Sequence, residues 1–326
     1  MVNTVPDAEL PIIDAHHHLY PSNHWGDGPY LLSEFQKDLE DGHNVISTIY
    51  VECSQLYRET GPEHLRGAGE AEFAAVTGRL SDTGHFGATR VCEGFVGRAD
   101  LDMGSAVEEV LAALDSASDG RLRGIRSPAI WDPDPGVNPS RRAFARQAIM
   151  AEPSFREGLA RLADHGLVYD AWQFYPQLGE LGDLAAAVPD ATIVCGHCGG
   201  LIGTGGYSGP ENFANWRARV LELAKRPNVF MKLGGLANSR TGFGLEKRPV
   251  RPDADELVEL WSPYIETCIE AFGADRCLFE SNFPVDQVAA DYRTLWTVYK
   301  RITEHCSADE KAMLYAGTAR RVYRLS

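Results

Sequence analysis

The chain has 326 residues, of which 44% are hydrophobic and 24% are charged, a composition typical of a globular protein with a full core. Its formal net charge of −15 argues against nucleic acid and against an anionic membrane surface as partners, because both are themselves negatively charged. No apolar run approaches the roughly 20 residues that span a bilayer, and the first residues lack the cationic and apolar regions of a secretory signal. Seven scattered cysteines do not make an even disulfide framework, so we expect a cytoplasmic protein.

Short β-branched runs alternate with longer segments of helical periodicity along the whole chain. Apolar runs with few polar interruptions are typical of strands buried on both faces, and apolar residues at three- and four-residue spacing are typical of helices. The predicted strands are residues 12–18, 45–53, 91–97, 122–128, 167–174, 192–198, 229–235 and 277–282. Helical segments separate them, and a final helix is predicted over 307–325.

Eight strands that are each followed by a helix predict a (β/α)8 TIM barrel of the α/β class, a single domain over residues 1–326. A doubly wound sheet has fewer strands and a glycine-rich first turn, and neither fits. Two connections are unusually long, 199–213 after the sixth strand and 236–253 after the seventh. Both follow the carboxyl end of a strand, where barrel enzymes carry their active sites, so we interpret them as substrate-covering loops. The alternative is a pair of surface insertions without function.

The strongest local motif is Asp14-Ala15-His16-His17-His18 at the end of the first strand. Side chains alternate across a strand, so His16 and His18 should point one way and His17 the other. Two imidazoles held side by side at the barrel mouth can ligate a metal or bind an anionic substrate. Polar rings inside a dry strand need partners, which favours a functional site over coincidence.

Later strands also carry a polar residue near their carboxyl ends. Any one of these could be a satisfied core group, but several in register are what an active site at the top of a barrel requires. They are Glu52, Arg126, Asp170 or Gln173, His197, Lys232, Glu280 and Asn282.

Together these motifs resemble a known family. The motifs DAHHH, RGIR, the segment PQLGELGDLAAAVPDATIVCGHCGG and SNFPVD occur in an order similar to the amidohydrolase superfamily, nearest its amidohydrolase-2 branch with 2-pyrone-4,6-dicarboxylate lactonase and sugar lactonases. The resemblance implies hydrolysis of a lactone, ester or amide. It also implies that His16 and His18 are the family's His-x-His pair, that His197 polarises the scissile carbonyl and that Arg126 holds a substrate carboxylate.

Two departures from the family pattern bear on the metal. Gln173 stands near the place on the fifth strand where metal-dependent members usually carry a ligand, and Asn282 stands where the family has the aspartate that activates water. An amide neither accepts a proton nor supplies anionic charge to a divalent metal. We therefore expect no tightly bound cofactor. One divalent metal, zinc or manganese, held by His16 and His18 is the alternative.

Two carboxylates are candidates for the missing base. Glu280 lies two residues before Asn282 and so on the same face, one layer deeper. It either acts as a displaced base or substrate orienter, or forms an internal ion pair with Lys232 or Arg126 that supports the site, and the sequence leaves both open. Asp286, in the following loop, is the weaker candidate.

The preferred hypothesis is a hydrolase of a small carboxylated ring compound, with a lactone as the expected substrate. Arg126, helped by Lys232, would anchor the carboxylate through its planar guanidinium. The three histidines would polarise the carbonyl and stabilise the oxyanion.

The remaining predicted substrate contacts are Glu52, Gln173 and Tyr207, and the expected partner is a small molecule. Two rival functions stay open: a metal-dependent amidohydrolase or decarboxylase on the same barrel, and a non-catalytic ligand-binding barrel. A homodimer is the ordinary expectation for its oligomeric state.

Overall fold

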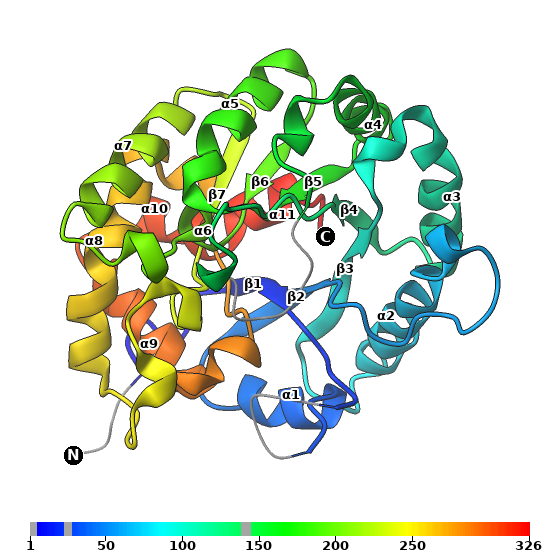
Figure 1. Ribbon diagram of the computed structural model, residues 1–326. Coiled ribbons are helices and arrows are strands. Elements are labelled where there is room, and N and C mark those ends of the chain that lie inside the picture. Colours follow the sequence, from blue (N-terminus) through cyan, green and yellow to red (C-terminus); the bar gives the residue numbers. More distant parts are fainter. Residues whose placement is uncertain (1–4, 23–27, 138–144) are drawn as a thin grey trace.

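The computed structural model describes residues 5–22, 28–137 and 145–326. Its eight strands form one parallel sheet in the order β1 to β8, and a backbone hydrogen bond of 2.8 Å from the Asn282 amide to the His16 carbonyl brings the last strand back to the first. Helices surround the ring of strands (Figure 1). The strands are β1 Ile12–His17, β2 Val45–Val51, β3 Arg90–Arg98, β4 Leu122–Arg126, β5 Val168–Ala171, β6 Ile193–Cys195, β7 Val229–Leu233 and β8 Cys277–Phe279. The predicted (β/α)8 barrel is confirmed.

Each strand is followed by a helix whose apolar stripe packs against the ring. Local sequence signals set some of the helix starts, for example the Asp253 side chain, which accepts a hydrogen bond of 2.9 Å from the Glu256 amide at the start of α8. The principal helices are α1 Leu32–Leu39, α2 Ala68–Asp82, α3 Val107–Ala117, α4 Pro153–Asp164, α5 Leu178–Ala187, α6 His197–Gly200, α7 Asn212–Leu223, α8 Ala254–Phe272 and α9 Tyr292–Ile302.

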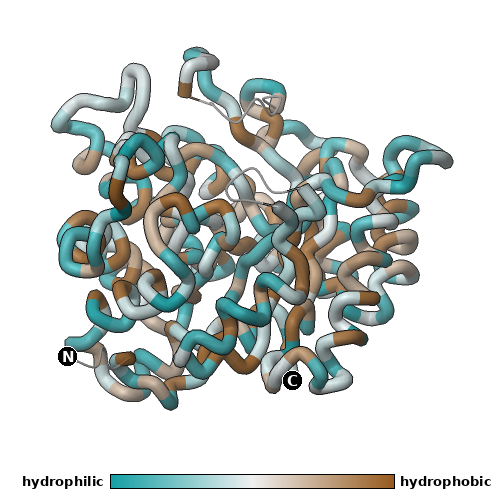
Figure 2. Tube along the Cα trace, turned by 90° about the horizontal axis from the view of Figure 1, so that it is seen from below, coloured by the Kyte–Doolittle hydropathy of each residue, from teal (hydrophilic) through white to brown (hydrophobic). Residues whose placement is uncertain are grey.

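The chain ends in three consecutive helical segments, which replace the single predicted helix over 307–325. They are α10 Ala308–Ala312, the π-helical turn η11 Met313–Gly317 and α11 Thr318–Val322. α11 lies across the centre of the ring in Figure 1. In the side view of Figure 2 the C-terminus lies at one end of the barrel, and long loops project from the other.

Two hydrophobic clusters form the core. The larger one fills the layer between strands and helices. The smaller one joins apolar side chains of the strands to Ala319, Val322 and Tyr323 of the C-terminal segment, so that segment closes the barrel interior from below. Among the described residues, no helix is both long enough and apolar enough to cross a membrane.

The two long connections lie next to each other at the barrel mouth. The Gly203 amide in the first donates a hydrogen bond of 2.7 Å to the Arg240 carbonyl in the second. Each contains short 3-10 turns, Gly205–Tyr207 in the first and Ser239–Thr241 in the second. Their predicted role in covering substrate stays a prediction.

Candidate active site

The alternation predicted for the first strand is confirmed. His16 Nε2 lies 3.1 Å from His18 Nε2, whereas His17 faces the helix layer, where its ring stacks at 4.4 Å from that of Phe35. Between Asp14 and His17 the first strand advances by three residues, while its partner β2 advances by two. This β-bulge re-aims the end of the strand, so both outer histidines reach the barrel interior.

A hydrogen bond defines the tautomer of His18, and two groups face His16. His18 Nδ1 lies 2.8 Å from the Val51 carbonyl, which only accepts, so the hydrogen is on Nδ1 and His18 Nε2 is an acceptor. His16 Nε2 lies against that atom. His16 Nδ1 faces both Lys232 Nζ at 3.5 Å and Glu280 Oε2 at 2.9 Å. Burial and the charge of Lys232 hold the pKa of His16 well below its usual value, which keeps this ring neutral.

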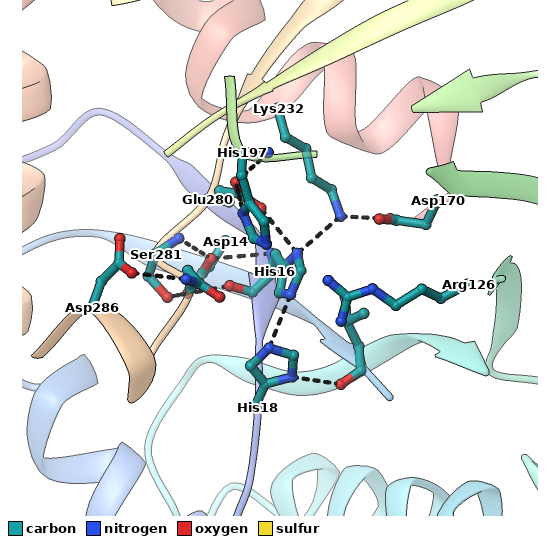
Figure 3. Close-up of polar contacts among 12 residues, drawn as sticks. Asp14, His16, His18, Arg126, Asp170, His197, Lys232, Glu280, Ser281 and Asp286 are labelled. Carbon is teal, nitrogen blue, oxygen red and sulfur yellow. Dashed lines mark hydrogen bonds and ion pairs between the residues drawn. The ribbon is translucent and has the colours of Figure 1, made fainter. Parts of the chain in front are cut away.

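Lys232 belongs to a polar layer inside the barrel. Its Nζ atom donates to Asp170 Oδ2 at 2.5 Å, and both side chains are almost completely buried. The arrangement satisfies the requirement that a buried charge be paired. Figure 3 shows the Lys232 ammonium group between Asp170 and His16. The predicted contact of Lys232 with a substrate carboxylate stays a prediction.

Glu280 joins the two strands that carry the histidines. Its Oε1 atom accepts hydrogen bonds from the backbone amide of His197 at 3.1 Å and from His197 Nδ1 at 2.7 Å. Its Oε2 atom lies 2.9 Å from His16 Nδ1 (Figure 3). The sequence had offered Lys232 or Arg126 as its partners. The structure places the two histidines there instead, because Lys232 turns to Asp170.

His197 lies outside the sixth strand, although the sequence predicted a strand through residue 198. β6 ends at Cys195, and His197 has φ 55, a left-handed conformation that histidine adopts more readily than most residues. This turn directs both its amide and its ring to Glu280. The ring packs over Gly235, where a Cβ atom would lie 2.4 Å from His197 Nδ1. Only glycine leaves room for the histidine in this position.

A second carboxylate network joins β1 to the residues that follow β8. Asp14 accepts hydrogen bonds from the Ser281 amide at 2.8 Å, from its hydroxyl at 2.6 Å and from Tyr292 Oη at 3.0 Å. Burial raises the pKa of Asp14 to about 6. These bonds fix the two strand ends that carry His16 and Glu280.

Asn282 and Asp286 form a pair next to this network. Asn282 Nδ2 donates to Asp286 Oδ1 at 2.7 Å. Burial raises the pKa of Asp286 to about 8, so this carboxyl group holds a proton that an exposed aspartate would have lost. Asp286 therefore reaches the residue that replaces the expected aspartate, and its role as a base stays a prediction.

A small pocket opens next to His197. Its lining comes from the end of β5 and from the two long connections, and consists of Trp172, Phe174, His197, Gly200, Leu201, Gly235, Asn238 and Arg240. Two guanidinium groups share the Trp172 ring, since Arg126 Cζ lies 4.9 Å and Arg240 Cζ 5.3 Å from its centroid. The pocket is therefore an aromatic and cationic one, adjacent to the histidines.

Arg126 is buried and has no carboxylate partner within the described part of the chain. Its Nη1 atom donates to the Glu52 carbonyl at 3.3 Å, and its Nε atom makes no hydrogen bond to a described residue. Figure 3 shows its guanidinium pointing toward His16. A buried cation without a counter-charge is suited to an anionic group of a ligand.

The other predicted substrate contacts are spread around this centre. Gln173 is buried and donates to Cys195 Sγ at 3.2 Å. Glu52 is buried, and within the described part of the chain its carboxyl group accepts one long hydrogen bond of 3.5 Å, from Ser54 Oγ. Tyr207 donates to Asp132 Oδ2 at 2.6 Å. Their roles as substrate contacts stay predictions.

Sequence reasoning missed Arg240 and left Asp170 without a role. Arg240 lies in a long connection of no regular pattern, so no periodicity could place it in the pocket. Asp170 carried a usable signal, because it stands on the interior face of β5 two residues after Val168, which belongs to the interior cluster.

The donor set fits a divalent cation. Ligand atoms of His16, His197 and Glu280 lie within 4.8 Å of one another, and Glu280 Oε2 is a buried oxygen without a hydrogen bond among the described residues. Two imidazoles and one carboxylate are a donor set that catalytic zinc takes. A cation at His16 would compete with the hydrogen-bonded arrangement of that ring described above.

Comparisons with known proteins identify the family of this chain. A family model described as amidohydrolase matches residues 13–325. L-fucono-1,5-lactonase of Burkholderia multivorans is 30% identical over 55% of this chain and 58% of its own length. L-rhamnono-gamma-lactonase of Scheffersomyces stipitis is 24% identical over 87% of this chain and 88% of its own.

A solved amidohydrolase structure from Burkholderia multivorans with bound zinc superposes with a TM-score of 0.70 at 24% identity, covering 97% of this chain and 99% of that one. This likeness shows the fold. The match to the family model extends over nearly the whole chain and includes every residue of the histidine-centred site. The chain therefore belongs to the amidohydrolase family and is a hydrolase.

Proposed function

We propose that this protein hydrolyses a lactone, with His197 as the general base that activates water. One observation carries the proposal, the hydrogen bond of 2.7 Å between His197 Nδ1 and Glu280 Oε1. A carboxylate only accepts, so the hydrogen is on Nδ1 and Nε2 keeps its lone pair. A neutral imidazole oriented by a buried carboxylate is a common arrangement for a general base.

The reaction proceeds in two steps. Water attacks the lactone carbonyl carbon while His197 Nε2 accepts one of its protons, which forms a tetrahedral oxyanion. The intermediate then collapses, the bond from the carbonyl carbon to the ring oxygen breaks, and that oxygen takes the proton from His197. The product is an open-chain hydroxy acid, which ionises and releases one proton at neutral pH.

Arg126 supports a substrate that carries negative charge. The uncompensated guanidinium would hold a carboxylate of the substrate or the oxyanion of the intermediate, and Arg240 adds a second cation at the pocket wall. The aromatic ring of Trp172 between them suits a flat, small ring compound. The names of the lactonase relatives support the bond that is broken, and the arginines support the carboxylated substrate class.

We further propose that turnover does not require a metal, because both ring nitrogens of His16 already have close protein contacts, Nε2 with His18 and Nδ1 with Lys232 and Glu280. A divalent cation, where bound, would be held by His16, His197 and Glu280 and would polarise the carbonyl. Dialysis against a chelator is expected to leave kcat unchanged. Loss of activity that zinc or manganese restores would contradict this expectation.

The function is tested with purified protein and a panel of lactones, with proton release followed by a pH indicator. The panel contains L-fucono-1,5-lactone, L-rhamnono-gamma-lactone and a lactone that carries a free carboxylate. We expect turnover of at least one, with the carboxylated compound preferred, and a loss of about 100-fold or more in His197→Asn. His165→Asn is the control, since His165 is exposed and pairs with Glu108. Equal turnover in the two variants would contradict the catalytic role of His197.

A further inference from the structure

The last residues of the chain are fixed at the base of the barrel by polar contacts as well as by packing. The Ser326 amide and hydroxyl donate to Glu93 Oε1 at 2.9 and 2.7 Å, and Glu93 Oε2 accepts from Ser47 Oγ at 2.5 Å. Ala319, Val322 and Leu325 pack into the interior cluster. The segment is therefore held in a defined position below the polar layer of the barrel.

Tyr323 reaches from this segment into the polar layer. Its hydroxyl donates to Asp170 Oδ2 at 2.7 Å, the same oxygen that accepts from Lys232 Nζ at 2.5 Å. The ammonium group also lies 5.5 Å from the centroid of the Tyr323 ring. Tyr323 and Lys232 are fully buried, and Asp170 is 1% exposed, so no water shell competes with these contacts.

Lys232 needs such a restraint because its side chain is long and flexible. Asp170 is the salt-bridge partner of Lys232, and among the described residues Tyr323 is the other side chain that donates to this carboxylate. Without the tyrosine hydroxyl the carboxylate loses one of its two donors, and its position and that of Lys232 become less defined. Lys232 Nζ then no longer has a fixed place 3.5 Å from His16 Nδ1.

We propose that Tyr323 is a positioning residue of the active site, which acts through Asp170 to hold the Lys232 ammonium group beside His16. The route is continuous: Tyr323 Oη and Lys232 Nζ both donate to Asp170 Oδ2, and Lys232 Nζ lies 3.5 Å from His16 Nδ1. The C-terminal segment is thus part of the apparatus that orients the catalytic histidines, in addition to closing the core.

This inference rests on the proposed lactone hydrolysis for its kinetic test, which compares Tyr323→Phe with Tyr315→Phe. Tyr315 is also fully buried in the C-terminal helices, but its hydroxyl contacts Thr303 Oγ1 at 2.8 Å, away from the polar layer. We expect Tyr323→Phe to lower kcat about tenfold, the effect of one hydrogen bond to a charged group, with KM changed less than about twofold. Tyr315→Phe is expected to keep both constants while losing similar thermal stability.

A second variant separates positioning from general destabilisation. Asp170→Ala removes the acceptor that Tyr323 and Lys232 share, so adding Tyr323→Phe to it should cause no further loss in kcat. Full additivity of the two losses would overturn the proposed route. Equal kcat in Tyr323→Phe and Tyr315→Phe would overturn the positioning role itself.

The effect on His16 can also be measured without a substrate. Nitrogen-15 spectra of the histidine rings, with His16 assigned by comparison with His16→Gln, should show a different His16 Nδ1 shift in Tyr323→Phe than in the unmodified protein, because the neighbouring ammonium group is displaced. An unchanged His16 signal would contradict the inference. If the unmodified protein hydrolyses none of the lactones, the proposed function fails, and this spectrum still decides the role of Tyr323.

Discussion

Replacement of Glu280 by glutamine tests the centre of the mechanism. The carboxylate is fully buried and receives His197 Nδ1 at 2.7 Å and the His197 amide at 3.1 Å. Glutamine keeps the shape but removes the charge, and a hydrogen bond to a charged group contributes about 1.5–3 kcal/mol. Each 1.4 kcal/mol corresponds to about tenfold in rate, so this term alone predicts a loss of roughly 10- to 100-fold.

The tautomer of His197 adds to this loss. The amide of Glu280→Gln can turn its NH2 group toward His197 Nδ1, which would move the hydrogen to Nε2 and remove the lone pair that accepts the proton from water. Such a change of tautomer costs up to about 10⁴-fold in an enzyme with the same type of histidine–carboxylate pair. We therefore expect kcat to fall by at least about 100-fold.

The assay is proton release from the preferred lactone, with thermal unfolding measured in parallel. Glu70→Gln is the matched control, because Glu70 is also a buried, hydrogen-bonded carboxyl group but lies on α2, where it accepts from Tyr50 Oη and from the Cys53 amide, both at 2.8 Å. We expect the control to lose stability and to keep its kcat. An activity of Glu280→Gln within threefold of that of the control would refute the assignment of His197 as a base oriented by this carboxylate.

Three further outcomes are expected. Arg126→Met should raise KM for a carboxylated lactone by roughly 10- to 100-fold and leave KM for a neutral lactone nearly unchanged. Arg123→Met is the control and should change neither value, because Arg123 lies on the same strand and donates to the backbone carbonyls of Gly120 and Leu122. Burial raises the pKa of Asp286 to about 8, so the folded state keeps a proton that the unfolded state loses near pH 4. The free energy of unfolding should therefore fall as the pH rises from about 4 to about 8. Asp286→Asn should flatten that slope in urea unfolding, and identical slopes would contradict the burial effect. Gly235→Ala should lower kcat by displacing the His197 ring, with little change in KM.

Much of the architecture could be predicted from the sequence because its periodicities are local. Alternating strand and helix patterns predicted the (β/α)8 barrel, and the spacing of His16 and His18 predicted that both rings share a face. Arg126 was correctly placed on the fourth strand, and Asp286 was expected near the site. These features depend on the two-residue repeat of a strand. They also depend on the parallel arrangement of a barrel, which places the carboxyl ends of all its strands on one face.

Tertiary structure alone decided which groups meet across the barrel. Glu280 pairs with His16 and His197, and not with Lys232, because the chain turns sharply after β6 and aims the histidine inward. Lys232 turns instead to Asp170, and that carboxylate is completed by Tyr323 from the other end of the barrel. Contacts between residues far apart in the sequence follow from closure of the ring and from the C-terminal segment below it, which no local pattern encodes.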